Sequence, residues 1–384
     1  MAVNDMTIEQ GSKILNAIVS QASGAPLASI DTMNFITVAQ LGLKSGYEKM
    51  TDALSQVLSR TIFSTRPYYR KFSGLMVDNL RYGNHVRKVN YIDNEFEDDA
   101  RQGIADGSTV DQQKVKKPKV VQTNFYGEVV YSDSITIFKD QWDVALSSPE
   151  EFSRFVGGIF QNIQDRIEQA HESTNRFVIA NLMDGTAKKV KLIESYNAAK
   201  GTTLTASDIL KKENFTDFFQ FAYASIMTYS GLLTERTEEY HTKLTGKPIM
   251  RHTPKANQKL YGLSYYNNLV ETTVLSSVFN PEYLKGIDFE NVNFWQSLTT
   301  PEKIQGKFTS LNANGTLKQS AGTSPSAPIF AVLFDEEAAG VTTVNQWSAP
   351  SPFNAKGGYT NFNWHFTDRY WNDFTENSIV FTLE

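Results

Sequence analysis

Charged residues of opposite sign are segregated along residues 81–119, and their types and spacing are the first candidates for chemistry. A basic stretch comes first, an acidic stretch follows, and a second basic stretch closes the segment. The acidic residues are Glu95, Glu97, Asp98, Asp99, Asp106 and Asp111. Clustered carboxylates can ligate a hard cation such as Ca²⁺, but these lack the D-x-[DN]-x-[DN]-G spacing of a calcium loop. The pattern favours a solvated or partner-facing charged surface over a metal site.

We expect the two signs of charge in this segment to pair between neighbouring copies of the chain. An earlier helix carries an apolar stripe that also needs a partner. The residues singled out for such an inter-subunit contact are Arg81, Arg87, Lys88, Asp98, Asp99, Lys116, Lys117, Leu54 and Leu58.

Catalytic motifs are absent from the sequence. It contains no G-x-S-x-G elbow, no Walker A loop, no G-x-G-x-x-G and no H-E-x-x-H. His171 and Glu172 are followed by Asn175 where a zinc-binding helix would carry its second histidine. Cysteine is absent, and the histidines share no ligand spacing; we expect His241 on the surface and His365 in aromatic packing. The sequence predicts no enzymatic role, no cofactor and no bound metal.

The composition argues against membrane insertion and dedicated nucleic-acid binding. The chain has 384 residues and a formal net charge of −5, whereas a dedicated nucleic-acid binder is usually basic. No apolar run approaches the roughly 18 residues needed to span a bilayer, and the N-terminus lacks the features of a signal peptide. We expect two or three structural units in a protein made in the cytosol.

A long helix at 148–185 is the element around which the others must be arranged. Its first residues, Ser-Pro-Glu-Glu, form a capping box with proline at the first helical position. Apolar residues then recur at helical spacing. At ~1.5 Å per residue the helix would be about 50 Å long, too long to cover one compact core. Gly157 and Gly158 lie inside this helix. Two interpretations are open: the pair is a tolerated local weakness of the helix, or it marks a bend or the close approach of another backbone segment.

The residues before this helix read as an arm followed by a β-excursion. Amphipathic helices are expected at 8–19 and 44–63, with an apolar stripe that must be covered elsewhere, on another subunit for example. Strands at 86–92 and 120–131 flank the charged tip. A two-stranded hairpin is marginally stable by itself, so we expect the excursion to lie on another surface.

The residues after the helix give weaker signals. The expected elements are a polar connector at 186–206, a helix at 215–229, a strand at 248–252, a helix at 255–261, a strand at 292–298, a long surface loop at 299–328, a buried strand at 329–334 and a helical turn at 335–339. Alternating aromatic residues from Phe362 to Phe366 and an apolar run at 379–383 predict two antiparallel terminal strands. Asn372 and Asp373 suit the turn between them.

The order of these pieces resembles the major capsid protein of tailed double-stranded DNA bacteriophages, the spine-helix capsid fold. The similar blocks are 124–184 and 356–381. They hold the S-x-x-E start of the long helix and the run KGGYTNFNWHFTDRYWNDFTENSIVF, and the helix itself ends at Leu-Met-Asp-Gly. Within that family the chain looks closest to the head proteins of small short-tailed phages of the phi-twenty-nine kind.

The resemblance implies an α+β fold with five parts. These are an N-terminal arm at 1–67, an extended β-hairpin loop at 68–131, a peripheral domain at 132–204 with a spine helix at 148–184, a mixed α/β axial domain at 205–345, and C-terminal strands at 346–384 that return to the peripheral domain. The arm would lie across a neighbouring subunit, and the loop would overlap the adjacent one. Some relatives cross-link subunits through a Lys–Asn bond, but no positional match predicts one here.

The resemblance also implies a structural function. The chain would self-assemble into an icosahedral or prolate shell around packaged double-stranded DNA, in a virion built in the host bacterial cytoplasm. Its partners would be further copies in hexamers and pentamers, a separate scaffolding protein, a portal and other head proteins, and loosely contacted DNA, with no membrane. The alternative is the shell protein of a non-viral, encapsulin-like compartment. Another virion component and an unrecognised α/β hydrolase fit the order of elements less well.

Overall fold

The computed structural model describes residues 8–23, 38, 49, 72–77, 86–92, 103–110, 113, 115, 117–244, 249–273, 288–311, 317–321 and 328–384. The chain divides into two compact units, which we describe one at a time. Unit 1 comprises Met1–Tyr82, Glu128–Thr174 and Thr342–Arg369, and unit 2 comprises Gly83–Gly127, Asn175–Val341 and Tyr370–Glu384. The expected second helix of the arm, at 44–63, lies outside the described residues apart from Lys49.

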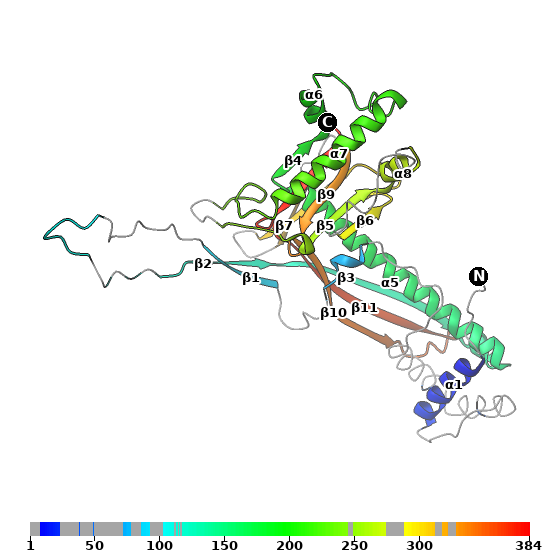
Figure 1. Ribbon diagram of the computed structural model, residues 1–384. Coiled ribbons are helices and arrows are strands. Elements are labelled where there is room, and N and C mark those ends of the chain that lie inside the picture. The colour runs from blue at the N-terminus through cyan, green and yellow to red at the C-terminus, as the bar shows by residue number, and fades with distance from the viewer. Residues whose placement is uncertain are drawn as a thin grey trace. The chain divides into compact units, whose positions relative to one another are not determined.

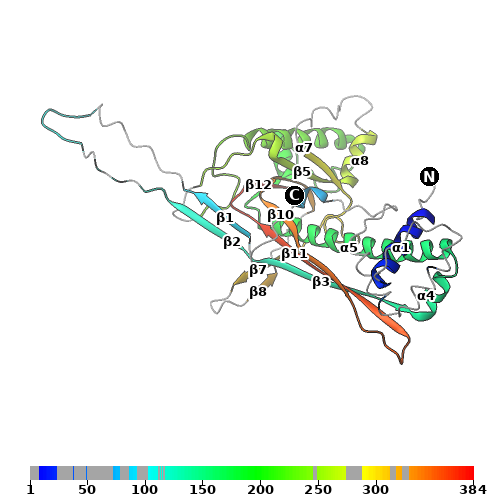
Figure 2. The same cartoon turned by 90° about the horizontal axis from the view of Figure 1, so that it is seen from below.

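Unit 1 combines helices with a three-stranded sheet. Its helices are α1 (Ile8–Ser23), η1 (Ser73–Leu75), α4 (Lys139–Ala145) and the first part of α5 (Pro149–Gly185). The sheet has the order β10-β11-β3, from strands β3 (Gly127–Phe138), β10 (Ala339–Pro350) and β11 (Tyr359–Asn372). Figure 2 shows β3 and β11 running side by side. The strand after the β-excursion therefore continues to Phe138 and leads into a short helix.

The core of unit 1 explains the period-2 pattern of the aromatic strand. Phe362, Trp364 and Phe366 are buried while their neighbours along β11 are half-exposed. The cluster also contains apolar residues of β3, α4 and α5 and one face of α1: Ile14, Leu15, Ile18, Val19, Ile137, Trp142, Leu146, Phe152, Val156 and Ile163. The stripe of the first arm helix is thus covered by its own chain. The cover that the sequence predicted elsewhere thus comes, for α1, from other parts of the same chain and not from another subunit.

Helix α5 confirms the expected long helix. The backbone N–H of Glu151 donates to the Ser148 hydroxyl oxygen at 3.2 Å, so the serine caps the helix as its sequence pattern indicates. A side chain at Gly158 would meet nothing within 4 Å. A close backbone approach therefore does not explain the glycine at this position.

Unit 2 is built on a five-stranded mixed sheet of order β4-β12-β9-β5-β6. Its strands are β4 (Lys188–Lys191), β5 (Gln258–Leu263), β6 (Asp288–Val292), β9 (Ile329–Asp335) and β12 (Ser378–Thr382). β9 is antiparallel to both β12 and β5, whereas the outer pairs β12–β4 and β5–β6 are parallel. Every residue of β9 is buried, which confirms the buried strand expected at 329–334.

Aromatic side chains join the helices of unit 2 to this sheet. The helices are α6 (Leu192–Lys200), α7 (Lys212–Leu232), α8 (Ser264–Thr273) and the single turn η3 (Lys255–Asn257). Figure 1 shows α7 lying along the sheet. Phe219 and Tyr223 of α7 each place their ring centroid 5.9 Å from that of Phe330 on β9. Among the described helices, none combines the length and apolarity needed to cross a membrane.

Two hairpin-like pairs complete unit 2. β1 (Val86–Tyr91) pairs antiparallel with β2 (Val120–Phe125), and β7 (Lys307–Leu311) pairs with β8 (Leu317–Ala321). We call the first pair the ribbon. It confirms the two limbs expected for the β-excursion, although β2 ends before Gly127 and the strand then resumes as β3.

Several expected elements are wrong because tertiary pairing outweighs local sequence preference. The connector at 186–206 holds β4 and α6, and residues 258–263 form a strand rather than a helix. The strand expected at 292–298 ends at Val292 as β6, and the loop expected at 299–328 contains β7 and β8. The helical turn at 335–339 is a tight turn that leads into β10, and residue 251 makes an isolated bridge with Thr237.

The terminal strands also differ from expectation. β11 lies in the three-stranded sheet, whereas β12 pairs with β4 and β9 of the five-stranded sheet. The expected antiparallel pairing of the last two strands is therefore wrong. Residues 373–377 form the connection between them.

The C-terminal end of α5 contacts the start of the β7–β8 pair and the connection that follows β11. Asn181 Oδ1 accepts the backbone N–H of Lys307 at 2.7 Å. A Cβ built at Gly306 would lie 2.5 Å from Asp184 Oδ2, so only glycine fits against this carboxylate. Asp184 is buried, and among the described residues neither of its carboxylate oxygens has a hydrogen-bond partner. Burial raises its pKa, although nearby Lys189 acts in the opposite direction.

We predict opposite effects from two glycine-to-alanine substitutions. A Cβ at Gly127 would lie 2.4 Å from the backbone oxygen of Tyr370, so G127A should lower the free energy of unfolding by about 1–3 kcal/mol, as overpacking does. G158A is the matched control, at an open helical position, and should raise it by about 0.5–1 kcal/mol. Urea unfolding monitored by circular dichroism measures both. Equal effects of the two variants would contradict the close approach at Gly127.

We predict that D184N raises thermal stability at neutral pH. The carboxyl has a higher pKa in the folded chain, so its favourable contribution is present below the unfolded pKa and is lost as the pH rises through the folded pKa. The melting temperature of D184N should therefore exceed that of the wild type at pH 7, and the gap should shrink towards pH 4. D217N, at an exposed site on α7, serves as the control. A gap that widens on acidification would refute this reading of Asp184.

Candidate functional site: a charged anchor at the base of the ribbon

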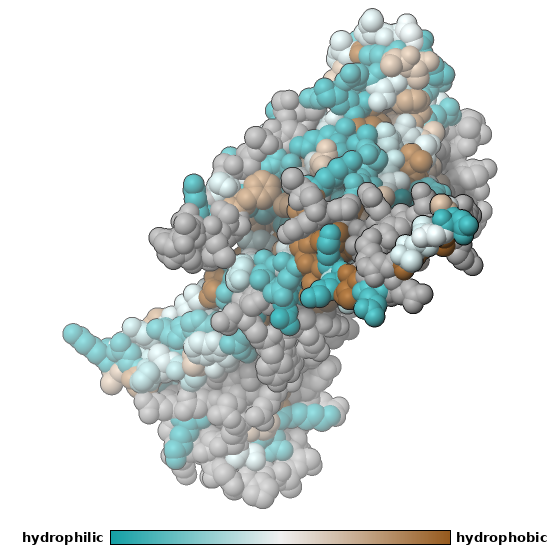
Figure 3. Space-filling model, turned by 90° about the vertical axis from the view of Figure 1, so that its left-hand side faces the viewer, coloured by the Kyte–Doolittle hydropathy of each residue, from teal (hydrophilic) through white to brown (hydrophobic). Residues whose placement is uncertain are grey.

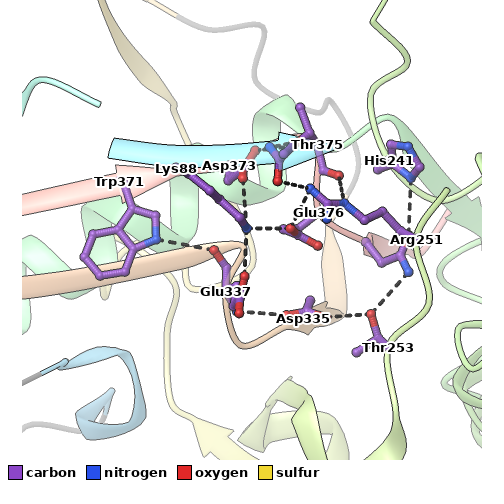
Figure 4. Close-up of polar contacts among 12 residues, drawn as sticks. Lys88, His241, Arg251, Thr253, Asp335, Glu337, Trp371, Asp373, Thr375 and Glu376 are labelled. Atoms are coloured by element: carbon purple, nitrogen blue, oxygen red, sulfur yellow. Dashed lines mark hydrogen bonds and ion pairs between the residues drawn. The ribbon is translucent and has the colours of Figure 1, made fainter. Parts of the chain in front are cut away.

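One lysine of β1 reaches into a cluster of carboxylates in unit 2. Lys88 Nζ lies 2.8 Å from Glu337 Oε2, 3.2 Å from Asp373 Oδ2 and 2.5 Å from Glu376 Oε1. Glu337 stands in the turn between β9 and β10, and the two other acids stand in the connection between β11 and β12. Figure 4 shows the ammonium pointing between the three carboxylates. We call Lys88, Arg251 and these three acids the anchor cluster.

Arg251 is the second cation of the anchor cluster. Its Nη2 lies 2.8 Å from Glu376 Oε1 and donates to Asn90 Oδ1 at 2.9 Å. Its Nε donates to the backbone oxygen of Thr375 at 3.1 Å. Asn90 is two residues beyond Lys88 on β1, so both side chains lie on the same face of the strand. That face of the ribbon is therefore tied to unit 2 at two successive positions.

The acids of the anchor cluster are held in place by their own hydrogen bonds. Asp373 Oδ1 accepts from both the backbone N–H and the hydroxyl of Thr375, at 2.9 and 2.6 Å. The Trp371 indole N–H donates to the backbone oxygen of Glu337 at 3.3 Å. A Cβ at Gly340 would lie 2.1 Å from the Trp371 ring, so glycine is needed for the indole to lie there.

A buried polar chain continues from the anchor cluster (Figure 4). Asp335 Oδ1 accepts the backbone N–H of Glu337, and its Oδ2 accepts the Thr253 hydroxyl at 2.7 Å. Asn377 Nδ2 donates to the same hydroxyl oxygen at 3.2 Å, and its Oδ1 lies 3.4 Å from His241 Nδ1. His241 is thus buried, and its expected surface position is wrong. Burial lowers its pKa.

Electrostatics keep Lys88 charged. Burial disfavours the ammonium, but the attraction of Asp373 and Glu376 and the hydrogen bonds to the glutamates outweigh it and raise the pKa of Lys88. Burial raises the pKa of Glu376, and the negative charge of Asp373 raises it further. The positive charges of Lys88 and Arg251 act in the opposite direction but do not cancel the effect. A protonated lysine is not a nucleophile. The arrangement can therefore hold the ribbon in place, but it does not activate an amine.

The structure brings few of the nine sequence-predicted contact residues together. Lys88 lies in the anchor cluster, with its charge paired inside the chain. Arg87 is exposed on the opposite face of β1, and Lys117 is exposed just before the start of β2. The others lie outside the described residues: Leu54, Leu58, Arg81, Asp98, Asp99 and Lys116.

Sequence reasoning missed the acceptors of Lys88. Glu337 belongs to an acidic pair that resembles ordinary surface charge. Asp373 and Thr375 carried a usable signal, because an Asp followed two residues later by Thr commonly forms an Asx turn. Nothing in the sequence indicates that Arg251 would reach them.

His171, singled out as half of an incomplete zinc motif, has a structural role in unit 1. Its Nδ1 lies 2.8 Å from Asp368 Oδ2, and the other oxygen of that buried carboxylate accepts the Thr343 hydroxyl at 2.9 Å. The histidine thereby ties α5 to β11 and β10. His365 packs against Trp347 with ring centroids 4.0 Å apart. Within the described residues, no group of three or more potential ligands could hold a metal ion.

We predict that K88M destabilises the protein by about 2–3 kcal/mol. Removing one partner of a buried pair costs about 3–5 kcal/mol, reduced here because Lys88 is 21% exposed and Glu337 66%. The raised lysine pKa means that this contribution is present below pH 10.5 and is lost as the pH rises through the folded pKa. K117M, at an exposed lysine, is the control and should change stability by less than about 0.5 kcal/mol. Equal urea midpoints for K88M and the wild type would contradict the anchoring role.

Comparison with solved structures finds the same fold in phage heads. The chain resembles a protein in the capsid structure of Staphylococcus phage Andhra, with a TM-score of 0.55 and 12% identity over 84% of this chain and 87% of that one. It resembles a chain in the structure of the head fiber and inner core protein gp22 of native bacteriophage P68, with a TM-score of 0.54 and 10% identity over the same shares. At these identities the likeness shows the fold alone. No curated protein sequence matches the chain.

The family assignment rests on the sequence and not on the structural likeness. The sequence profile of the Phi29-like phage major capsid protein family matches residues 15–382. This range covers the ribbon, α5, the five-stranded sheet and the aromatic strand β11, and the α+β class expected from the sequence is confirmed. The protein therefore belongs to the Phi29-like phage major capsid protein family.

Proposed function

We propose that the chain builds the head shell by self-assembly, and that the ribbon overlaps a neighbouring copy. A structural capsid role follows from the family. The observation that supports the role of the ribbon is its two unlike faces. One face is anchored through Lys88 and Asn90, and the other carries Arg87, Val89 and Tyr91, which are exposed.

The outward face of the ribbon has the composition of a contact surface. Tyr91 is 72% exposed and Val89 51%. The register sets Tyr91 opposite Val120, which is 54% exposed, so three apolar side chains lie close together on adjacent strands. On the face of the molecule drawn in Figure 3, apolar areas are small and separated by hydrophilic ones. An apolar group on a narrow ribbon therefore fits a surface that becomes covered on assembly.

The finer assignments follow the family pattern. On this proposal residues 1–67 act as the arm, 68–131 as the extended loop, 132–204 with 346–384 as the peripheral domain, and 205–345 as the axial domain that lines the centres of hexamers and pentamers. A separate scaffolding protein and a portal would complete the head during assembly in the host cytoplasm. The net charge of −5 supports loose contact with packaged double-stranded DNA. The chain would have no enzymatic activity.

The alternative of an encapsulin-like compartment has no support from the family or from the matched structures. The discriminating feature would be an inner docking site for a cargo peptide, and the sequence does not identify one. The shell of a tailed phage therefore remains the proposed function.

Electron microscopy of the purified chain, alone and co-expressed with its neighbouring genes, tests this function. We predict closed or partial shells tens of nanometres across with five-fold and six-fold units. Light scattering across a concentration series measures the size of the assembled species. A chain that stays monomeric at every concentration, even beside its scaffolding partner, would end the capsid proposal.

We further predict that V89S/Y91S folds normally but loses at least tenfold in shell yield, because its outward face no longer offers apolar contact.

The charge reversal K116E/K117E should also fold normally and lose at least tenfold in shell yield if the segregated charges pair between copies. Folding is checked by the thermal midpoint of the subunit and assembly by sedimentation. Normal shell yields for V89S/Y91S would show that the ribbon does not overlap a neighbour through its outward face. Normal yields for K116E/K117E would show that the segregated charges do not pair between copies.

A further inference from the structure

The loop between β6 and β7, residues 293–306, is held by contacts at its neck. The Gln296 side chain donates to the backbone oxygen of Gln305 at 2.9 Å and accepts the backbone N–H of the same residue at 2.7 Å. This two-bond clasp closes the loop where its two limbs meet. The backbone N–H of Trp295 adds a further cross-link, to the oxygen of Pro301 at 2.9 Å.

The neck of this loop is also anchored in the interior of unit 2. The Trp295 side chain is 1% exposed, and its indole N–H donates to the backbone oxygen of Ile329 on β9 at 3.1 Å. Arg176 of α5 donates to the Phe294 backbone oxygen and holds its guanidinium carbon 3.6 Å from the centroid of the Phe294 ring. Ile304, on the returning limb, is buried as well.

The apex of the loop has the opposite character. Residues 297–300 are all exposed, and Leu298 is 75% exposed. A single exposed leucine is common on protein surfaces and means little by itself. What distinguishes Leu298 is the ordered neck beneath it, because ordering loop residues costs about 1–2 kcal/mol each in backbone entropy. A side chain presented on an ordered loop loses little further freedom when it binds.

We propose that the 293–306 loop is a preformed docking knob, and that Leu298 inserts into an apolar site on a second copy of this chain. The choice of occupant rests on the proposed shell function and on the chemistry of the apex. The apex sequence Ser-Leu-Thr-Thr carries no charge, so it lacks the cations that would bind nucleic acid. One leucine offers too little apolar area for a membrane surface. A protein surface met repeatedly in a shell of many copies fits an uncharged apolar knob.

The absence of cysteine from the chain gives a direct test. The single-cysteine variant L298C should react with a maleimide-polyethylene glycol as an unassembled subunit and become at least tenfold slower in shells. A224C, at an exposed site on α7, reports how far assembly alone restricts the reagent. A benzophenone attached through the thiol of L298C should cross-link to another copy in shells and not in subunits. Equal labelling of L298C in shells and subunits would overturn the proposal.

Assembly of a charged variant gives the second readout. L298E should keep the thermal midpoint of the wild-type subunit, because the side chain is exposed, while its shell yield falls at least tenfold. L298M, which keeps an apolar side chain, should assemble normally. Normal shells from L298E would overturn the docking knob and leave the shell function intact, whereas failure of the wild-type chain to form shells would reject the shell function itself.

Discussion

A two-stranded ribbon cannot hold its own position, and the charged anchor at its base resolves this constraint. Lys88 places one ammonium among three carboxylates, and Arg251 ties the last of them to Asn90 on the same strand face. The acids outnumber the cations, which holds the lysine in its charged form. The anchor fixes one face of the ribbon and leaves the opposite face available for another surface.

Helix α5 also depends on other parts of the chain to bury its apolar residues. It is too long for one core, and its residues are shared between the two units. Its first part contributes Phe152, Val156 and Ile163 to the core of unit 1. Two other segments pack against its C-terminal end, at Asn181 and Gly185. Asn181 accepts the backbone N–H of Lys307, and a Cβ on Gly185 would lie 2.3 Å from the Phe374 ring. The Leu-Met-Asp-Gly ending is therefore shaped by packing as well as by helix termination.

The sequence predicted those parts of the fold where local pattern and burial agree. The capping box and apolar stripe gave α5, alternating aromatics gave β11, and a continuous apolar run gave β9. It failed where pairing between distant segments decides the structure. Residues 258–263 look helical in isolation but lie between β9 and β6, and β4 is a lysine-rich strand that only its parallel partner β12 explains. The same reason limited prediction of the site. Lys88 was recognisable as a charged residue, but its acceptors lie between 249 residues (Glu337) and 288 residues (Glu376) further along the chain.

The most direct measurement is a cryo-electron microscopy map of assembled wild-type particles that resolves side chains. It should show Lys88 paired with Glu337, Asp373 and Glu376 of its own chain, and the apolar outward face of the ribbon at Tyr91 covered by a different copy. Both features follow from a ribbon anchored on one face and bound to a neighbour on the other. A map in which Lys88 pairs with acids of another copy, or in which Tyr91 faces solvent in the closed shell, would contradict that arrangement.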